Sequence, residues 1–176
     1  MKRTFSMVAL AIVFAAVVPQ RAGAADRLHL QASFAVAFAA TPNSPPVAYC
    51  GGPALDFKVE AHGDGYSSLG ALAFFLQKTI SAAGALHGCL SFTTPDGDSL
   101  FATYDGTQGQ ANENNFITDG RGTLIFTGGT GLFAGASGRA FFTAVFAPLP
   151  SGAGTGPLQG LAFYMVDGKV SVGRGE

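Results

Sequence analysis

Hydrophobic and polar residues alternate along much of the chain with a period of two. Within 28–38 every second position is Leu, Ala, Phe or Val, and most positions between them are polar or small. The segment 55–62 repeats the pattern, and its polar side carries Asp56, Lys58, Glu60 and His62. Such alternation is typical of a β-strand that buries one face. Both segments are therefore predicted to be half-buried strands.

Turn-forming residues separate further segments of β pattern. Strands are expected at 69–80, 86–94, 99–104, 122–127, 139–147, 158–166 and 169–172. The prolines of 41–46 end the first strand, turns are predicted at 63–65, 95–98 and 167–168, and loops at 105–119 and 148–157. Eight or nine short strands without a convincing helix predict an all-β fold. A sandwich and a closed antiparallel barrel both fit this pattern, and closure best removes exposed strand edges.

A glycine-dense corner lies between two of these segments, at 128–138. Its glycines are Gly128, Gly129, Gly131, Gly135 and Gly138. Glycine is expected where the backbone adopts a positive φ or where two segments approach closely. Phe133 lies among them, and we predict that it acts as an apolar plug. The corner offers no nucleophile, base or metal ligand, so its role is expected to be structural.

The N-terminus has the features of a bacterial secretory signal peptide. Lys2 and Arg3 precede an apolar run over 7–18, and small residues at 22–24 lead to a cleavage site before Ala25. The run is shorter than the ~20 residues that a membrane-spanning helix needs. We therefore predict a cleaved signal rather than a membrane anchor.

The mature chain is then 25–176, and its length fits a single domain. The signal contains Lys2, Arg3 and Arg21 and no acidic residue, so acidic residues outnumber basic ones in the mature chain. No basic groove is expected, and nucleic acid is not a predicted partner. A secreted or periplasmic location is predicted, without a transmembrane helix.

Cys50 and Cys89 are the two cysteines of the chain. In an exported protein an isolated pair most often forms a disulfide, which we predict here. A catalytic thiol and a metal site are weaker interpretations. Neither cysteine lies in a C-x-x-C motif, and His29, His62 and His87 show no zinc spacing. No metal and no cofactor are predicted.

Other chemical motifs are sparse. His62 and Asp64 offer two metal ligands without a third, and Asp96 and Asp98 flank a turn glycine, so turn geometry explains both pairs. Arg139 shares a strand face with Phe141. It would anchor an anionic ligand if that face pointed inward, but an outward, solvated arginine is the favoured expectation. Catalytic and ligand-binding residues are not assigned.

The corner at 128–138, entered by 122–127, resembles a recurring motif of allene oxide cyclase-like and dirigent-like barrels. The segment Gly63-Asp64-Gly65-Tyr66-Ser67-Ser68-Leu69-Gly70 is similar to one in secreted bacterial relatives, and the turns at 93–98 and 103–107 have counterparts there. The resemblance covers about 55–147. It implies an eight-stranded antiparallel closed barrel with an apolar cavity, commonly trimeric in the plant members. It transfers no activity, because the acidic and polar groups inside the plant barrels have no matching residues here.

The chain has 16 Phe and only 12% charged residues. Large apolar groups occur on both faces of 139–146, 72–76 and 161–166, whereas a strand with one wet face should alternate cleanly. Part of the outer surface is therefore expected to be covered by a partner subunit, a packed loop or lipid. An outer-membrane barrel is less favoured because aromatic girdles are absent, and a homo-oligomer is predicted, trimeric by resemblance.

Three functional classes follow from these patterns. The favoured one is a secreted barrel that binds a small apolar molecule in its interior. The alternatives are a cyclase- or isomerase-like enzyme acting on a small hydrophobic substrate and a non-catalytic structural envelope protein. An ionisable group deep in the barrel would favour the enzyme. Alternation places Asp56, Lys58 and Glu60 outside, which favours binding.

Overall fold

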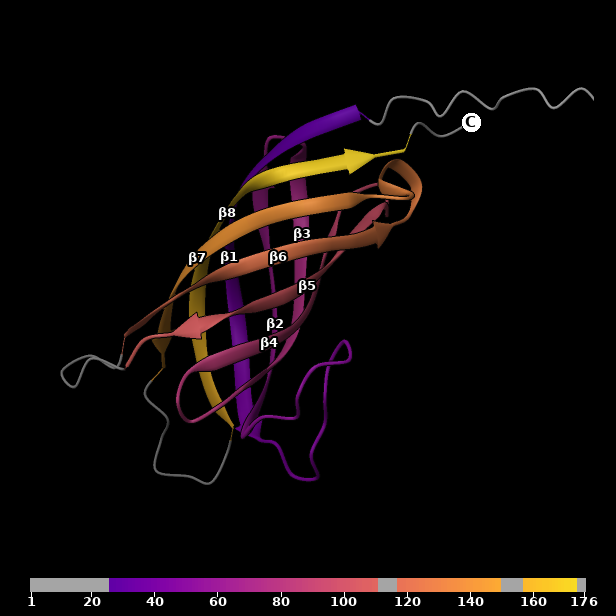
Figure 1. Ribbon diagram of the computed structural model, residues 1–176. Helices are drawn as coiled ribbons and strands as arrows, with labels where there is room; N and C mark the ends of the chain where they lie inside the picture. The colour runs from indigo at the N-terminus through magenta and orange to yellow at the C-terminus, as the bar shows by residue number, and fades with distance from the viewer. Residues whose placement is uncertain (1–25, 111–116, 150–156, 174–176) are drawn as a thin grey trace, which may run out of the picture.

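The computed structural model describes residues 26–110, 117–149 and 157–173, in which eight antiparallel strands close into a barrel (Figure 1). The strands are β1 (Asp26–Pro42), β2 (Phe57–Ser67), β3 (Gly70–Ile80), β4 (Ala85–Thr93), β5 (Ser99–Gln108), β6 (Thr118–Gly129), β7 (Ser137–Pro148) and β8 (Leu158–Val172). Each strand pairs with the next along the chain, and β8 pairs back to β1. The predicted all-β closed barrel is confirmed. The predicted signal peptide lies outside the described residues.

Only one helical element occurs in the described part of the chain, the short 3₁₀ helix η1 (Gly131–Phe133). Among the described residues no helix has the length and apolar character needed to cross a membrane.

The barrel interior is filled largely by aromatic side chains. The Phe34 ring stacks on Phe92 with centroids 5.0 Å apart and lies 5.1 Å from Phe74. Further along the axis, Tyr104 stacks on Phe142 at 4.3 Å. All five rings are buried because they occupy the inward positions of their strands. This apolar interior differs from the polar interior typical of outer-membrane barrels.

Two predicted turns lie inside strands, so those predictions are wrong. Residues 63–65 belong to β2, and 167–168 belong to β8. Gly63 and Gly65 face β1, where a Cβ on Gly65 would lie 2.5 Å from a ring carbon of Phe34. A Cβ on Gly168 would lie 2.3 Å from the Cα of Ala140. These glycines allow close packing inside a continuous ladder, which the sequence pattern does not distinguish from a turn.

The predicted loop at 105–119 is also too long. β5 continues to Gln108, and β6 begins at Thr118, with Gly106 paired to Gly122. Added Cβ atoms on these two glycines would come within 2.9 Å and 2.6 Å of the Phe142 ring. The glycines therefore make room for a core aromatic ring at this point of the barrel.

The connection between β1 and β2 packs against the outside of the barrel. Cys50 in this connection forms the predicted disulfide with Cys89 of β4, with the two Cα atoms 5.8 Å apart. The Thr79 hydroxyl donates a hydrogen bond of 2.9 Å to the carbonyl of Pro53. Thr79 faces away from the barrel axis but is fully buried under this connection. A packed loop therefore covers part of the outer surface.

The glycine corner forms the connection between β6 and β7. Gly128, Gly131, Gly135 and Gly138 have positive φ values. A Cβ added to Gly129 would lie 2.5 Å from the Cβ of Phe133, so the glycine leaves room for this side chain. Phe133 is fully buried in the core cluster. This corner lies at the upper right of Figure 1, far from the β1–β2 connection at the lower end.

Candidate functional site

The inward register of β3 contains one charged residue, Lys78. Leu72, Phe74 and Leu76 point into the barrel, and Lys78 is the next position of the same face. Opposite Lys78 on β4 lies Gly88, where an added Cβ would be 2.6 Å from the Lys78 Cβ. A glycine at this position allows the lysine stem to run inside the barrel.

Aromatic side chains surround the Lys78 ammonium group. Lys78 is 1% exposed, and its Nζ lies 3.4 Å from the hydroxyl oxygen of Tyr164. Nζ also lies 4.4 Å from the ring centroid of Phe146 and 5.3 Å from that of Tyr104. Within the described residues, Lys78 forms no ion pair. The Tyr104 hydroxyl is buried and makes no hydrogen bond of normal geometry in the described part of the chain.

Burial changes the acid–base properties of this cluster. Desolvation lowers the pKa of Lys78 to about 7, because the charged form loses its hydration and gains no carboxylate partner. The ring faces of Phe146 and Tyr104 favour the ammonium form but do not offset this effect. Burial also raises the pKa of Tyr164 and, together with the neighbouring Tyr164, that of Tyr104. Both phenols therefore stay protonated at neutral pH.

A hollow of about 370 Å³ lies at the end of the barrel where β1 ends and β2 begins. Its lining residues are Ala40, Pro42, Phe57, Ile80, Ser81, Ala82, Gln108 and Leu158, and we call this hollow the mouth. Phe57 and Leu158 belong to the inward registers of β2 and β8, yet they are 41% and 44% exposed. Lys78 lies one inward position deeper than Ile80, about 7 Å along the strand.

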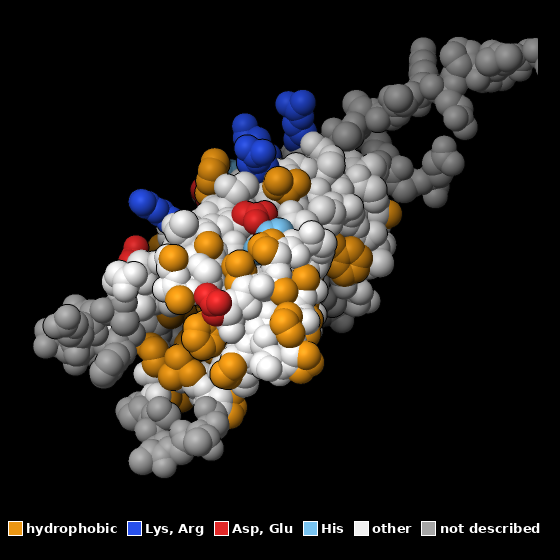
Figure 2. Space-filling view, turned by 60° about the horizontal axis from the view of Figure 1, so that its bottom comes forward, with side chains coloured by type: hydrophobic (Ala, Val, Ile, Leu, Met, Phe, Trp, Pro, Cys, Tyr) orange, Lys and Arg blue, Asp and Glu red, His pale blue; other side chains and the backbone are white. Residues whose placement is uncertain are grey.

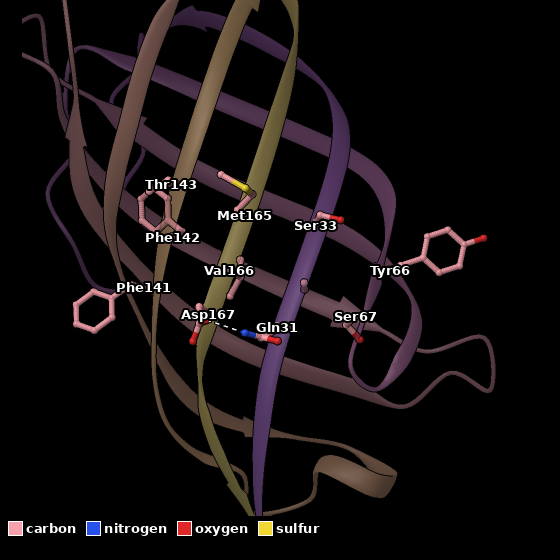
Figure 3. A pocket seen from close by; sticks show the side chains of 11 residues that line it. Gln31, Ser33, Tyr66, Ser67, Phe141, Phe142, Thr143, Met165, Val166 and Asp167 are labelled. Carbon is pink, nitrogen blue, oxygen red and sulfur yellow. Dashed lines mark hydrogen bonds between the residues drawn. The ribbon is translucent and has the colours of Figure 1, made fainter.

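Two further hollows lie on the outside of the barrel wall. One of about 570 Å³ lies over β7, β8, β1 and β2, with Phe141 and Tyr66 on opposite sides of it (Figure 3). Between them the Gln31 amide donates a hydrogen bond of 3.1 Å to Asp167. Tyr66 also lines the neighbouring hollow of about 530 Å³. Both hollows open directly to the outer surface, and neither one is lined by Lys78.

The outer face also carries a continuous apolar surface. Val145 of β7 pairs with Phe163 of β8, which pairs with Ala35 of β1. Leu161 and Met165 flank Phe163 on the same face, and these large side chains are about half exposed. We call Val145, Leu161, Phe163, Met165 and Ala35 the outer apolar wall. Figure 2 shows hydrophobic side chains spread over one face of the barrel, with lysine and arginine side chains along one side.

The structure places Arg139 and His62 on the outer surface. Arg139 is exposed and faces outward with Phe141. His62 is exposed and stacks on Phe75 at 5.4 Å. The described residues contain no group of three or more His, Cys, Asp or Glu side chains that could hold a metal ion. The disulfide is formed, and the glycine corner surrounds Phe133, so neither supplies reactive chemistry.

The hydrophobic pattern of the sequence did not identify Lys78. Alternation placed Asp56, Lys58 and Glu60 outside the barrel and made no assignment for Lys78, which is buried inside it. A deep ionisable group of this kind is the feature expected of the enzyme alternative. Continuing the series Leu72, Phe74, Leu76 by one step would have placed Lys78 inside. The outward Phe75 makes both faces of the strand apolar, so the pattern alone did not show which face is inward.

Comparison with solved structures gives a distant match. No family model matches the chain, and no curated protein sequence matches it. Among solved structures, the pterocarpan synthase dirigent protein GePTS1 matches with a TM-score of 0.48 and 16% sequence identity. The match covers 90% of this chain and 99% of that chain. The closed barrel described above rests on the strand pairing of this chain itself.

Proposed function

We propose that the protein binds a small, mainly apolar molecule at the mouth of the barrel. The observation that carries this proposal is the exposure of Phe57 and Leu158. Both residues belong to the inward register, and both line a hollow that ends above a packed aromatic interior. Apolar side chains left uncovered in a concave site are typical of sites for small apolar ligands.

The lining of the mouth offers a ligand few polar groups, which favours an apolar ligand. Gln108 donates a hydrogen bond of 2.9 Å from its amide to the Thr118 hydroxyl, so this amide is already engaged. Among the described residues that line the mouth, none carries a charged side chain. Beneath it lie Phe38 and Phe146, whose rings meet edge to face at 6.2 Å. The ligand would therefore contact mostly carbon atoms until it approaches Lys78.

Binding can be tested with the neutral fluorophore N-phenylnaphthylamine, displaced by octanol, on the mature chain 25–176. The test variant is Phe57→Asp, and the matched control is Phe101→Asp, because both phenylalanines are 41% exposed. Phe101 lies on the outer face of β5, away from the mouth. We expect Phe57→Asp to weaken binding at least tenfold and Phe101→Asp to leave it unchanged. Equal effects of the two variants, or no binding to the wild-type chain, would refute the proposal.

We also propose that further copies of this chain cover the outer apolar wall. Contiguous apolar patches of this kind mark association sites in soluble proteins. The trimer predicted from the family resemblance is one such assembly.

We also propose that the protein is exported from the cytoplasm, because a disulfide such as Cys50–Cys89 is typical of oxidising compartments.

Native mass spectrometry of the mature chain tests the assembly. Phe163→Glu places a charge at the centre of the outer apolar wall, and Phe101→Glu is a control on a different outer surface. We expect the wild type and Phe101→Glu to be oligomeric and Phe163→Glu to be monomeric. A monomeric wild-type chain at micromolar concentration would contradict the proposal. The same spectra would reveal a co-purified ligand by its mass.

A further inference from the structure

We propose that Lys78 is a nucleophilic amine that captures the aldehyde or ketone group of a small apolar molecule as an imine. The inference rests on the proposed function, because the carbonyl compound has to enter through the mouth. It adds a reactive residue and a chemical class of ligand to the binding of an apolar molecule.

The surroundings of Lys78 favour the neutral amine, which is the nucleophilic form. Its Nζ contacts two aromatic ring faces and one phenol, and no described carboxylate pairs with it. An unpaired ammonium group in such a site is much harder to bury than a neutral amine. Desolvation in an apolar pocket is one of the standard ways in which proteins activate a lysine.

The acid–base properties agree with this geometry. With its pKa lowered to about 7, Lys78 is about half neutral near pH 7, whereas on the order of one in a thousand ordinary lysines is neutral there. In the part of the chain that the structure describes, the titratable groups that face Nζ are Tyr164 of β8 and Tyr104 of β5. Their pKa values are raised by burial, so they contribute hydroxyl groups and no negative charge.

The reaction needs no partner beyond the carbonyl compound. The Nζ lone pair attacks the carbonyl carbon, a C–N bond forms, and the carbonyl electron pair moves to oxygen, which takes up the proton released by nitrogen. The resulting carbinolamine loses its hydroxyl group as water when a second proton passes from nitrogen to that oxygen. The Tyr164 hydroxyl, 3.4 Å from Nζ, is placed to relay these protons. The net products are one imine and one water.

The position of Lys78 fits an approach from the mouth. Ile80 lines the mouth, and Lys78 is the next inward residue on the same strand, about 7 Å deeper. The flexible four-carbon stem of lysine allows Nζ to turn toward the base of the mouth. The apolar part of the ligand would then remain between Phe57 and Leu158 while its carbonyl group meets Nζ.

The inference is tested by treating the mature chain with octanal and cyanoborohydride, which reduces an imine to a stable secondary amine. Peptide mapping then reports the modification of each lysine. We expect Lys78 to be modified at least tenfold more than Lys58 and Lys169, which lie on the outer face. Octanol should suppress labelling at Lys78 alone, because it occupies the mouth without forming an imine. Labelling at Lys78 should also level off above about pH 8, since its pKa is about 7.

Three variants complete the test. Lys78→Met and Lys78→Arg should lose the site-specific adduct, whereas the control Lys169→Met should keep it. Absence of labelling at Lys78 in the wild type, or labelling that octanol does not reduce, would overturn the inference. Tighter binding of octanoate than of octanol, without an octanal adduct, would also overturn it, because Lys78 would then be a charged anchor.

The outcomes separate this inference from the proposed function. If N-phenylnaphthylamine binds at the mouth and octanal leaves Lys78 unmodified, only the imine inference fails. If the fluorophore does not bind, the proposed function fails irrespective of the labelling result.

Discussion

Replacing Lys78 by methionine is expected to change how the stability of the protein depends on pH. The lysine is fully buried, and its pKa falls from 10.5 to about 7 on folding. Between these two values the unfolded chain carries a proton that the folded chain has lost. The free energy of unfolding therefore rises with pH in this window, because the unfolded state binds more protons. Below the folded pKa both states are protonated, and the full penalty of a buried ammonium group remains.

The size of the effect follows from the shift. A difference of about 3.5 pKa units corresponds to about 5 kcal/mol over the whole window. Between pH 7 and pH 9 the relief amounts to about 2 kcal/mol, since Lys78 is already half neutral at pH 7. Measurement above about pH 10 is less informative. There the raised pKa values of Tyr104 and Tyr164 lower stability as the unfolded phenols ionise.

Urea unfolding at pH 7, 8 and 9 measures this effect in the wild type, in Lys78→Met and in Lys169→Met. Lys78→Met should be the more stable protein at pH 7, because an apolar side chain of similar length replaces an unpaired buried amine. Its advantage over the wild type should shrink by about 2 kcal/mol by pH 9. Lys169→Met, at an exposed position, should follow the wild type. A constant difference between Lys78→Met and the wild type across this range would refute the reasoning.

Two further predictions concern the framework of the barrel. Phe133→Ala should destabilise the barrel by roughly 3–5 kcal/mol in urea unfolding, because it removes a fully buried ring. A loss of stability below ~1 kcal/mol would contradict the assignment of Phe133 to the core. Replacing both Cys50 and Cys89 by serine should cost roughly 3–4 kcal/mol by the same measurement, since the disulfide closes a sequence separation of 39 residues. An unchanged midpoint would show that the disulfide contributes little by constraining the unfolded chain.

The sequence predicted the overall fold more accurately than it predicted where the strands end. Alternation within 28–38 and the Asp-Gly turn at 95–98 identify their elements because local chemistry decides them. Gly65 and Gly168 misled the prediction of turns, because a glycine that accommodates Phe34 or Ala140 across the barrel has the same local signature as a turn glycine. Only the register between strands distinguishes the two cases.

The candidate site depended even more on tertiary structure. The mouth is formed by residues from five strands and has no contiguous motif. Lys78 lay within reach of the alternation argument, but Phe75 on the opposite face obscured the register. Its lowered pKa follows from enclosure by Tyr104, Phe146 and Tyr164, and those three residues come from three other strands. The lowered pKa of Lys78 therefore could not be predicted from the segment 69–80 alone.

The stability measurement and the labelling experiment address separate requirements for a reactive lysine. Stability reports whether Lys78 is neutral in the folded protein, because it depends only on the proton released on folding. Labelling reports whether a carbonyl group can reach Nζ from the mouth. A pH-dependent stability without an octanal adduct would describe a buried amine behind closed packing, with Phe38 and Phe146 as the barrier. A pH-dependent stability together with an octanal adduct would indicate that Lys78 has a functional role. An inward methionine would fill the same space without the energetic cost of burying an amine, so stability alone would not favour a lysine there. Reactivity would then be the property that a lysine adds at this position of β3.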